Sequence, residues 1–179
     1  IPEAALSVYR RERAAGRGRD KAVLETALLS RLRMLDRNVY ESLPDGGDGA
    51  GARLWKAVRE ESTLEDIAQA ARTKRYPLAR MRRMLLCAAL GVSAEYTKTI
   101  PPYARVLAAD SAGCAYLREI DGKSAVPVLT KPAAVRRLDG GAAKVFALGA
   151  SAHDVYTLQN VTNSDKKCGQ DWRNGPVIV

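Results

Sequence analysis

The sequence predicts a mainly helical α+β protein, in which a small α/β lobe follows a helical lobe. Up to about residue 99, apolar residues recur at every third or fourth position, as in amphipathic helices. Beyond the Pro-Pro pair at 101–102, short strand-like and helical segments alternate, which indicates a small unit with a parallel pair of strands. We therefore expect a connector over residues 1–19, a helical basic lobe over 20–99, and a small α/β lobe with a loop-rich tail over 100–179.

The first helices are marked by their caps and breakers. Residues 1–19 are expected to form a short helix that runs into a flexible connector. Asp20 is a candidate N-cap for a helix whose apolar residues step by three or four as far as Val39, and Pro44 ends it. The glycine-rich stretch 45–51 is expected to be a loop. It lacks the preceding strand and the following Gly-Lys-Ser/Thr of a phosphate-binding loop.

Three further helices resemble helix-turn-helix geometry. The first is expected over residues 52–60, and the capping-box pattern Ser62–Glu65 predicts a second through Ala71. A tight connection at 73–76 leads to the third, which extends from Pro77 to Gly91 because proline suits a helix start and glycine its end. In helix-turn-helix proteins one helix braces another that meets nucleic acid.

The start of this last helix is strongly basic. Leu78, Met81, Leu85 and Ala88 are spaced to face a core, whereas the arginines project from other sides. The charge alone leaves two interpretations open, a polyanion-binding face or a solvated helix surface. Tyr76 is a candidate for stacking on a base, although a tyrosine at the edge of the core is the commoner structure. The cations of this basic block, six of them without an intervening acid, are Arg72, Lys74, Arg75, Arg80, Arg82 and Arg83.

The second lobe is expected to be built from short elements. Strands are expected over 103–109 and 126–130, and the rest of the lobe is expected to be helix and loop. The expected helices cover 112–120, 132–138, 142–148 and 152–158, and the tail 159–179 is expected to be mostly loop.

Composition favours a globular cytoplasmic protein with a polyanionic partner. The formal net charge is +9, and 46% of the residues are apolar. The cysteines Cys87, Cys114 and Cys168 are odd in number and widely spaced, which fits neither a disulfide framework nor a C-x-x-C metal site. No apolar run approaches the roughly 18 residues of a membrane helix, so no membrane partner is expected. The chain opens without a methionine, which suggests a fragment.

We expect no catalytic and no metal-binding residue in this chain. His153 is the only histidine, which excludes sites that need two, such as the H-E-x-x-H zinc site. Ser151 and Asp154 flank it, but neighbouring residues on a helix point in different directions and no G-x-S-x-G elbow is present. Cys87 lies within an apolar run and is expected to be buried and unreactive.

Several runs resemble one enzyme family over most of residues 20–179. The most specific is TKRYPLARMRRMLLCAALGV at 73–92. It is followed by PYARVLAADSAG at 102–113 and PVLTK at 127–131. Together with LSRLRML at 29–35 and ASAHDVYTL at 150–158, these runs resemble the C-terminal portion of the bacterial tRNA(Met) cytidine acetate ligases, within the nucleotidyltransferase superfamily.

The resemblance implies a parent enzyme that modifies tRNA. Members of this family use ATP to activate acetate as acetyl-adenylate, and then acetylate N4 of the wobble cytidine of elongator tRNA(Met). Their N-terminal nucleotidyltransferase domain carries an H-x-G-H motif and would lie before Ile1. We therefore expect that domain and tRNA to be the partners of this chain. No cofactor is expected in the chain itself, which alone would be inactive, and ATP and acetate would be handled by the missing domain.

The sequence departs from the family pattern in one segment. Relatives tend to read acidic-Gly-Leu-Glu-Asn-Arg where this chain has Asp48-Gly-Ala-Gly-Ala-Arg53. Only the acidic residue, Gly49 and Arg53 match. A contact that relatives make through the Glu or the Asn is therefore not expected here.

The resulting hypothesis is a tRNA-engaging, domain-packing region. Lys74, Arg75, Arg80 and Arg83 are expected to contact tRNA phosphates, with Arg72 and Arg82 as weaker candidates and Tyr76 as a possible RNA contact. One alternative is a structural module in which the arginines pair with the nucleotidyltransferase domain or with a partner subunit, without touching RNA. A DNA-binding helix-turn-helix protein is a further alternative, which the α/β lobe disfavours.

Overall fold

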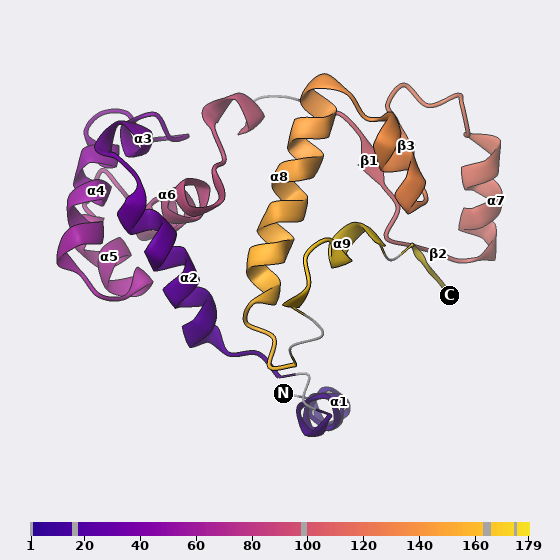
Figure 1. The fold of residues 1–179 in the computed structure, drawn as a ribbon, viewed down its shortest axis with the longest axis horizontal. Helices are drawn as coiled ribbons and strands as arrows, with labels where there is room; N and C mark the ends of the chain where they lie inside the picture. Colours follow the sequence, from indigo (N-terminus) through magenta and orange to yellow (C-terminus); the bar gives the residue numbers. More distant parts are fainter. Residues whose placement is uncertain (1, 16–17, 98–99, 163–165, 174) are drawn as a thin grey trace.

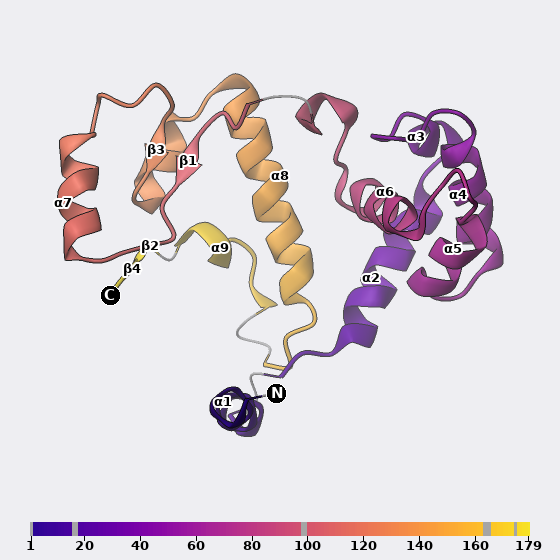
Figure 2. The ribbon, with the colours of Figure 1, turned by 180° about the vertical axis from the view of Figure 1, so that it is seen from behind.

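The computed structural model is mainly helical with small parallel sheets, as the sequence predicts (Figure 1). It describes residues 2–15, 18–97, 100–162, 166–173 and 175–179. Helices α2 to α6, within residues 21–90, gather on one side. On the other side lie β1 (Ala104–Arg105), α7 (Ser111–Glu119) and β3 (Val128–Leu129), with α8 (Gly140–Thr157) between the two groups. Figure 2 shows the same arrangement from behind. None of the described helices is long and apolar enough to cross a membrane.

The first group of helices surrounds one apolar core. Fully buried side chains at its centre include Leu32, Leu54, Ile67, Met81 and Met84. The helices are α2 (Lys21–Met34), α3 (Arg37–Glu41), α4 (Ala50–Glu60), α5 (Leu64–Ala71) and α6 (Leu78–Leu90).

The helix expected from Asp20 to Val39 is in fact two helices. Asp20 does cap α2, because its Oδ1 accepts a 2.9 Å hydrogen bond from the Ala22 N–H. The chain then turns extended at Leu35, and α3 starts after Asp36. The break leaves the backbone oxygen of Leu35 without a helical hydrogen bond. Arg59 of α4 donates a hydrogen bond to this oxygen at 3.0 Å. Helical periodicity continues across the break, which is why the sequence did not reveal it.

Helices α3 and α4 approach so closely that only glycine fits at Gly51. A Cβ built on Gly51 would lie 2.2 Å from the carbonyl oxygen of Tyr40. Tyr40 is itself fully buried and donates its hydroxyl to the Leu32 carbonyl at 2.6 Å. Burial raises the pKa of Tyr40 to about 12, against the opposing effect of nearby Arg59. The contact fixes the path of the 42–49 loop that joins the two helices.

The ends of α5 and α6 lie where the sequence predicts them, except that the cap of α5 is shifted by one residue. The capping residue of α5 is Thr63 instead of Ser62, and its Oγ1 accepts from the Asp66 N–H at 3.1 Å. Helix α6 follows Pro77 and ends at Gly91, whose φ of 75° is the left-handed conformation that glycine adopts readily.

The second part of the chain holds two pairs of parallel strands. The expected strand over 103–109 is two short strands, and the first pairs with β3 in the parallel arrangement predicted, with Ala104 opposite Val128. The second pairs with a strand in the tail, which the sequence analysis expected to be mostly loop. The strands are β1 (Ala104–Arg105), β2 (Ala108–Ala109), β3 (Val128–Leu129) and β4 (Val177–Ile178).

The helices of this part differ from expectation mainly at α8. The two helices expected over 142–148 and 152–158 are one continuous helix, because small residues between them do not interrupt it. The segment expected as a helix over 132–138 is a 3-10 helix, η2. A second 3-10 helix, η1 (Ala94–Thr97), follows α6. The elements are α7 (Ser111–Glu119), η2 (Pro132–Arg137), α8 (Gly140–Thr157) and α9 (Gln170–Arg173).

Helix α8 connects the two parts. Its Val155 packs against the core of α2 to α6, whereas its Phe146 is buried in a second, smaller cluster with Leu129. Beyond its end, the Gln159 carbonyl accepts a 2.6 Å hydrogen bond from the Asp20 N–H at the start of α2. The expected boundary between the lobes at residue 99 lies outside the described residues, and the division into lobes stays a prediction.

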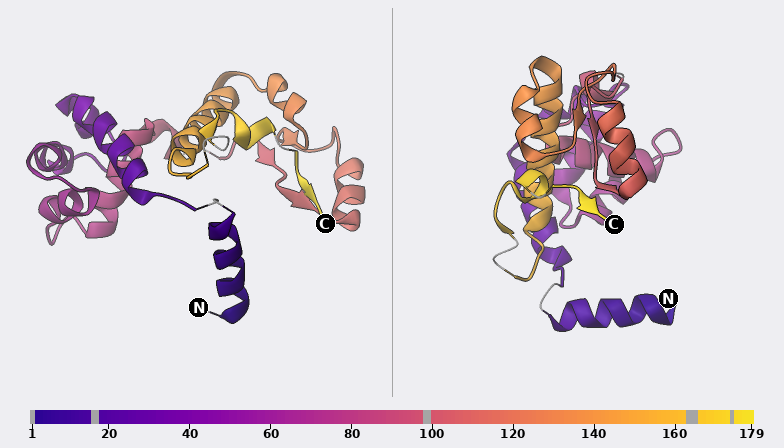
Figure 3. Two further views of the ribbon diagram at one scale, coloured as in Figure 1. Left: turned by 60° about the horizontal axis from the view of Figure 1, so that its bottom comes forward. Right: turned by 90° about the vertical axis from the view of Figure 1, so that its right-hand side faces the viewer.

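Helix α1 (Glu3–Ala14) stands apart from both groups (Figure 3). None of its residues is buried, and Tyr9 is 60% exposed. This confirms a short helix within residues 1–19. The connector expected after it includes residues 16–17, which lie outside the described residues.

The close contact at Gly51 predicts a large effect of a single methyl group. Gly51→Ala places its Cβ against the Tyr40 backbone and is expected to lower the free energy of unfolding by about 1–3 kcal/mol. Gly47→Ala is the matched control, because a Cβ there has no neighbour within 4 Å. Urea denaturation of both variants measures the difference. Equal stability of the two variants would contradict the packing described.

Candidate nucleic-acid interface

The connection between α5 and α6 presents the first cations of the basic block. It is a tight turn in which the Thr73 N–H donates to the Tyr76 oxygen at 3.1 Å and the Tyr76 N–H donates to the Thr73 oxygen at 3.2 Å. The end of α5 before it is held by Arg53, whose Nε donates to the Ala71 carbonyl at 3.0 Å. Arg53, one of the residues that match the family pattern, is therefore a capping residue for the α5 end.

Arg72 and Lys74 are the two cations of this turn whose charge is not shared with an acid in the described residues. Both side chains lie on the surface. Their charge is fully available to a polyanion.

The other cations of the block have partners within the chain. Arg75 Nη2 lies 2.6 Å from Asp48 Oδ2, and Arg83 forms an ion pair with Asp45. Arg80 donates to the backbone oxygen of Asp45. The basic block is therefore less positive at its surface than its sequence indicates.

Tyr76 has a packing role in this structure. The residue is only 8% exposed, and its hydroxyl donates to the backbone oxygen of Asp48. The guanidinium of Arg80 lies 5.0 Å from its ring centroid, a distance typical of a cation–π contact. The ring thus supports the loop and the arginine, and burial leaves little of it for a base to stack on.

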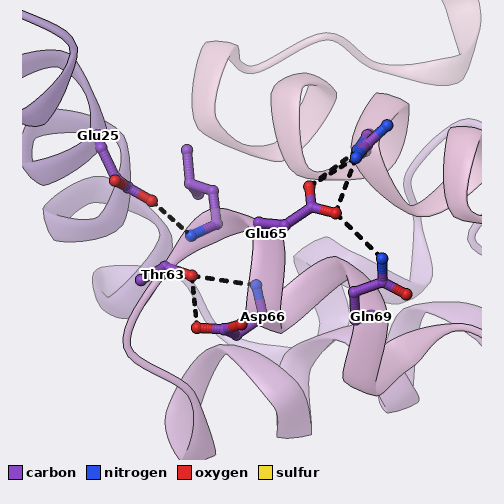
Figure 4. Close-up of polar contacts among 7 residues, drawn as sticks. Glu25, Thr63, Glu65, Asp66 and Gln69 are labelled. Atoms are coloured by element: carbon purple, nitrogen blue, oxygen red, sulfur yellow. Dashed lines mark hydrogen bonds and ion pairs between the residues drawn. The ribbon is translucent and has the colours of Figure 1, made fainter.

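Arg82 forms an ion pair with Glu65 of α5. Figure 4 labels this glutamate and Gln69 beside it. The Arg82 Nε lies 3.1 Å from Glu65 Oε2 and its Nη2 lies 2.7 Å from both carboxylate oxygens. Gln69 donates to the same carboxylate at 3.1 Å, one turn along α5. The hydrogen bonds from Arg82 and Gln69 lower the pKa of Glu65 below its ordinary value of 4.5.

The acidic partners were missed by the sequence analysis. Asp45 and Asp48 precede the arginines by about thirty residues, and Glu65 lies in another helix, so no local spacing reveals the pairs. A weak signal was present, because both aspartates occur in an otherwise uncharged glycine-rich loop beside a helix with unbalanced charge.

The described residues contain no group of three or more metal-ligating acids, histidines or cysteines. Asp154 accepts a 2.7 Å hydrogen bond from the Gly169 N–H, which gives it a structural partner, and the Nδ1 of His153 is buried. Burial raises the pKa of the Cys87 thiol, which makes the reactive thiolate scarcer.

Comparison with known proteins decides the family. The model of the family described as HIGH Nucleotidyl Transferase matches residues 1–171. The chain belongs to this family. We expected only the C-terminal portion of such an enzyme, with the likeness over most of residues 20–179. That limit is wrong, because the match to the HIGH nucleotidyl transferase family starts at residue 1 and includes α1.

The most similar relatives of this HIGH nucleotidyl transferase chain share one name. The tRNA(Met) cytidine acetate ligase of Syntrophomonas wolfei is 28% identical over 99% of this chain and 45% of its own length. That of Clostridium kluyveri is 32% identical over 76% of this chain and 32% of its own length. The chain thus spans less than half the length of these relatives.

Solved structures share the fold. The apo crystal structure of Thermotoga maritima TmcAL superposes with a TM-score of 0.83 at 20% identity, over 100% of this chain and 46% of that one. The form with bound alpha-thio ATP also gives a TM-score of 0.83, at 21% identity. This chain therefore shares the fold of that protein over its whole described length.

The pairing of Arg82 with Glu65 can be tested through the acid. In Arg82→Met the pKa of Glu65 is expected to rise toward 4.5, because its strongest hydrogen-bond donor is removed. Carbon-13 NMR titration of the glutamate carboxyls measures it. Since the folded pKa is lowered, the stabilising effect of the pair is present above the unfolded pKa and lost as pH falls through the folded value. An unchanged Glu65 titration in Arg82→Met would argue against the pair.

Proposed function

We propose that this chain is the tRNA-engaging region of an enzyme that acts as a tRNA(Met) cytidine acetate ligase. The enzyme would use ATP and acetate to form N4-acetylcytidine at the wobble position of elongator tRNA(Met). Support for the reaction comes from the relatives, which bear this name and match nearly the whole chain. The chain has one histidine and therefore no H-x-G-H motif, so activation of acetate would take place in another part of the enzyme.

The RNA contact proposed here is the basic block at the start of α6. Lys74, Arg75, Arg80 and Arg83 would contact phosphates, with Arg72 and Arg82 in secondary positions. The observation that carries this proposal is the exposed turn at 72–75, where Arg72 and Lys74 have no acidic partner within the described residues. Phosphate contacts of this kind position an RNA without reading its sequence. Choice of the wobble cytidine would therefore depend on other groups of the enzyme.

One observation favours a second candidate function. Arg75, Arg82 and Arg83 each have an acidic partner in the same chain, as expected of a packing module whose arginines stabilise the fold. In that case the chain would hold other parts of the enzyme together without touching RNA. Absence of any tRNA affinity in the 179-residue chain at low salt would favour this reading over the RNA contact.

The turn cations provide the direct test of the proposed function. The double variant Arg72→Ala/Lys74→Ala is expected to weaken binding of elongator tRNA(Met) about tenfold and to reduce the salt slope of log K by about 1.4–1.8. Fluorescence anisotropy over a range of salt concentrations measures both quantities. A duplex DNA of matched length serves as a competitor, and its preferential binding would instead support a DNA-binding protein.

Arg118→Ala/Lys123→Ala is the matched control for this double variant. It removes one arginine and one lysine from exposed positions at and beyond the end of α7, on the opposite side of α8. Binding of tRNA is expected to change by less than about twofold. Equal losses in the two double variants would indicate a general effect of net charge and would refute the assignment of the turn.

A further inference from the structure

The loop between α3 and α4 faces the basic block with both of its acids. Asp45 and Asp48 have φ angles of 64° and 58°, in the left-handed region where aspartate is more frequent than most residues. Glycines surround them, and the α3–α4 contact at Gly51 fixes where the loop ends. The two aspartates are therefore held in a defined position relative to α6.

Each aspartate contacts the basic block twice. The carboxylate of Asp45 pairs with Arg83, and its backbone oxygen accepts from Arg80. The carboxylate of Asp48 pairs with Arg75 at 2.6 Å, and its backbone oxygen accepts from Tyr76. Two loop residues thus contact three arginines of the block and the tyrosine that packs beside them.

Both ion pairs lie at the surface and are open to exchange. The side chains of Arg75 and Asp48 are 65% and 66% exposed, and those of Arg83 and Asp45 are 59% and 44% exposed. Exposed pairs of this kind contribute little to stability and are screened by salt. A phosphate presents oxygens that a guanidinium binds in the same manner as a carboxylate. A phosphate oxygen can therefore replace the aspartate at either arginine.

We propose that Asp45 and Asp48 are specificity-determining residues that occupy the phosphate positions of the basic block in the free protein. They hold Arg75, Arg80 and Arg83 in place for RNA. At the same time the two carboxylates compete with any polyanion for these arginines. An RNA with phosphates at both positions displaces both carboxylates from the arginines. A polyanion whose charges do not match both positions does not displace them. This inference rests on the proposed function, because the fitting ligand is the tRNA.

The double variant Asp45→Asn/Asp48→Asn removes the competing carboxylate charges without disturbing the fold of the loop. Asparagine keeps the size of the side chain and adopts positive φ readily, so the loop conformation is preserved. Heparin serves as a polyanion that lacks the spacing of an RNA backbone. We expect the variant to bind heparin about fivefold more tightly than the wild type. We also expect the gain for elongator tRNA(Met) to be smaller, so that the preference for tRNA over heparin falls.

The matched control is Glu41→Gln/Glu60→Gln, which changes the net charge by the same amount. These acids pair with Arg37 at 2.7 Å and with Lys56 at 3.6 Å on α3 and α4, and within the described residues neither pairs with a cation of the basic block. Both affinities are expected to change by less than about twofold in this control. A heparin gain no larger in Asp45→Asn/Asp48→Asn than in the control would overturn the inference.

The two proposals fail in different ways. If the wild type binds tRNA but the aspartate variant gains nothing for heparin, the inference fails and the proposed function stands. If the wild type shows no tRNA affinity, the proposed function fails, whereas a heparin gain specific to Asp45→Asn/Asp48→Asn still supports competition by the aspartates. Thermal unfolding of each variant verifies that the compared proteins are folded.

Discussion

The close contact between α3 and α4 is the constraint on which the candidate interface depends. Because Gly51 has no side chain, the first turn of α4 lies directly on the Tyr40 backbone. This contact determines the path of the connecting loop, and the loop in turn places Asp45 and Asp48 against the arginines of α6. The contact between Gly51 and the Tyr40 backbone therefore influences how much positive charge the basic block presents at the surface, although the block begins more than twenty residues after Gly51.

The helical elements were largely predictable because their signals are local. Asp20, Pro77 and Gly91 mark helix ends through their own backbone and side-chain chemistry, and the structure uses all three in that way. The break at Leu35 was not predictable from periodicity, because the apolar spacing continues through it. The tail strand β4 was also missed, because its pairing with β2 joins residues about seventy positions apart.

The candidate site also has a part that could be predicted from the sequence and a part that could not. The cluster of cations at residues 72–83 can be recognised from the sequence alone, and so can the family resemblance of the run at 73–92. Which of those cations are paired depends on tertiary structure, so the sequence ranking, with Arg72 and Arg82 as the weaker candidates, took no account of pairing. Among the residues that the structure describes, Arg72 and Lys74 of the turn have no acidic partner, whereas Arg75 and Arg83 already have carboxylate partners. The prediction can therefore be made for individual residues of the block and not only for its net charge.

In the proposed interface, tRNA phosphates meet the guanidinium groups at the start of α6. Nitrogen-15 NMR of the arginine side chains during a titration with elongator tRNA(Met) observes these groups directly. We predict that the Nε–Hε signals of Arg75 and Arg83 shift or broaden in step with binding, whereas that of Arg118 on α7 does not. Saturable binding of tRNA with the Arg75 and Arg83 signals unchanged would contradict the proposed interface.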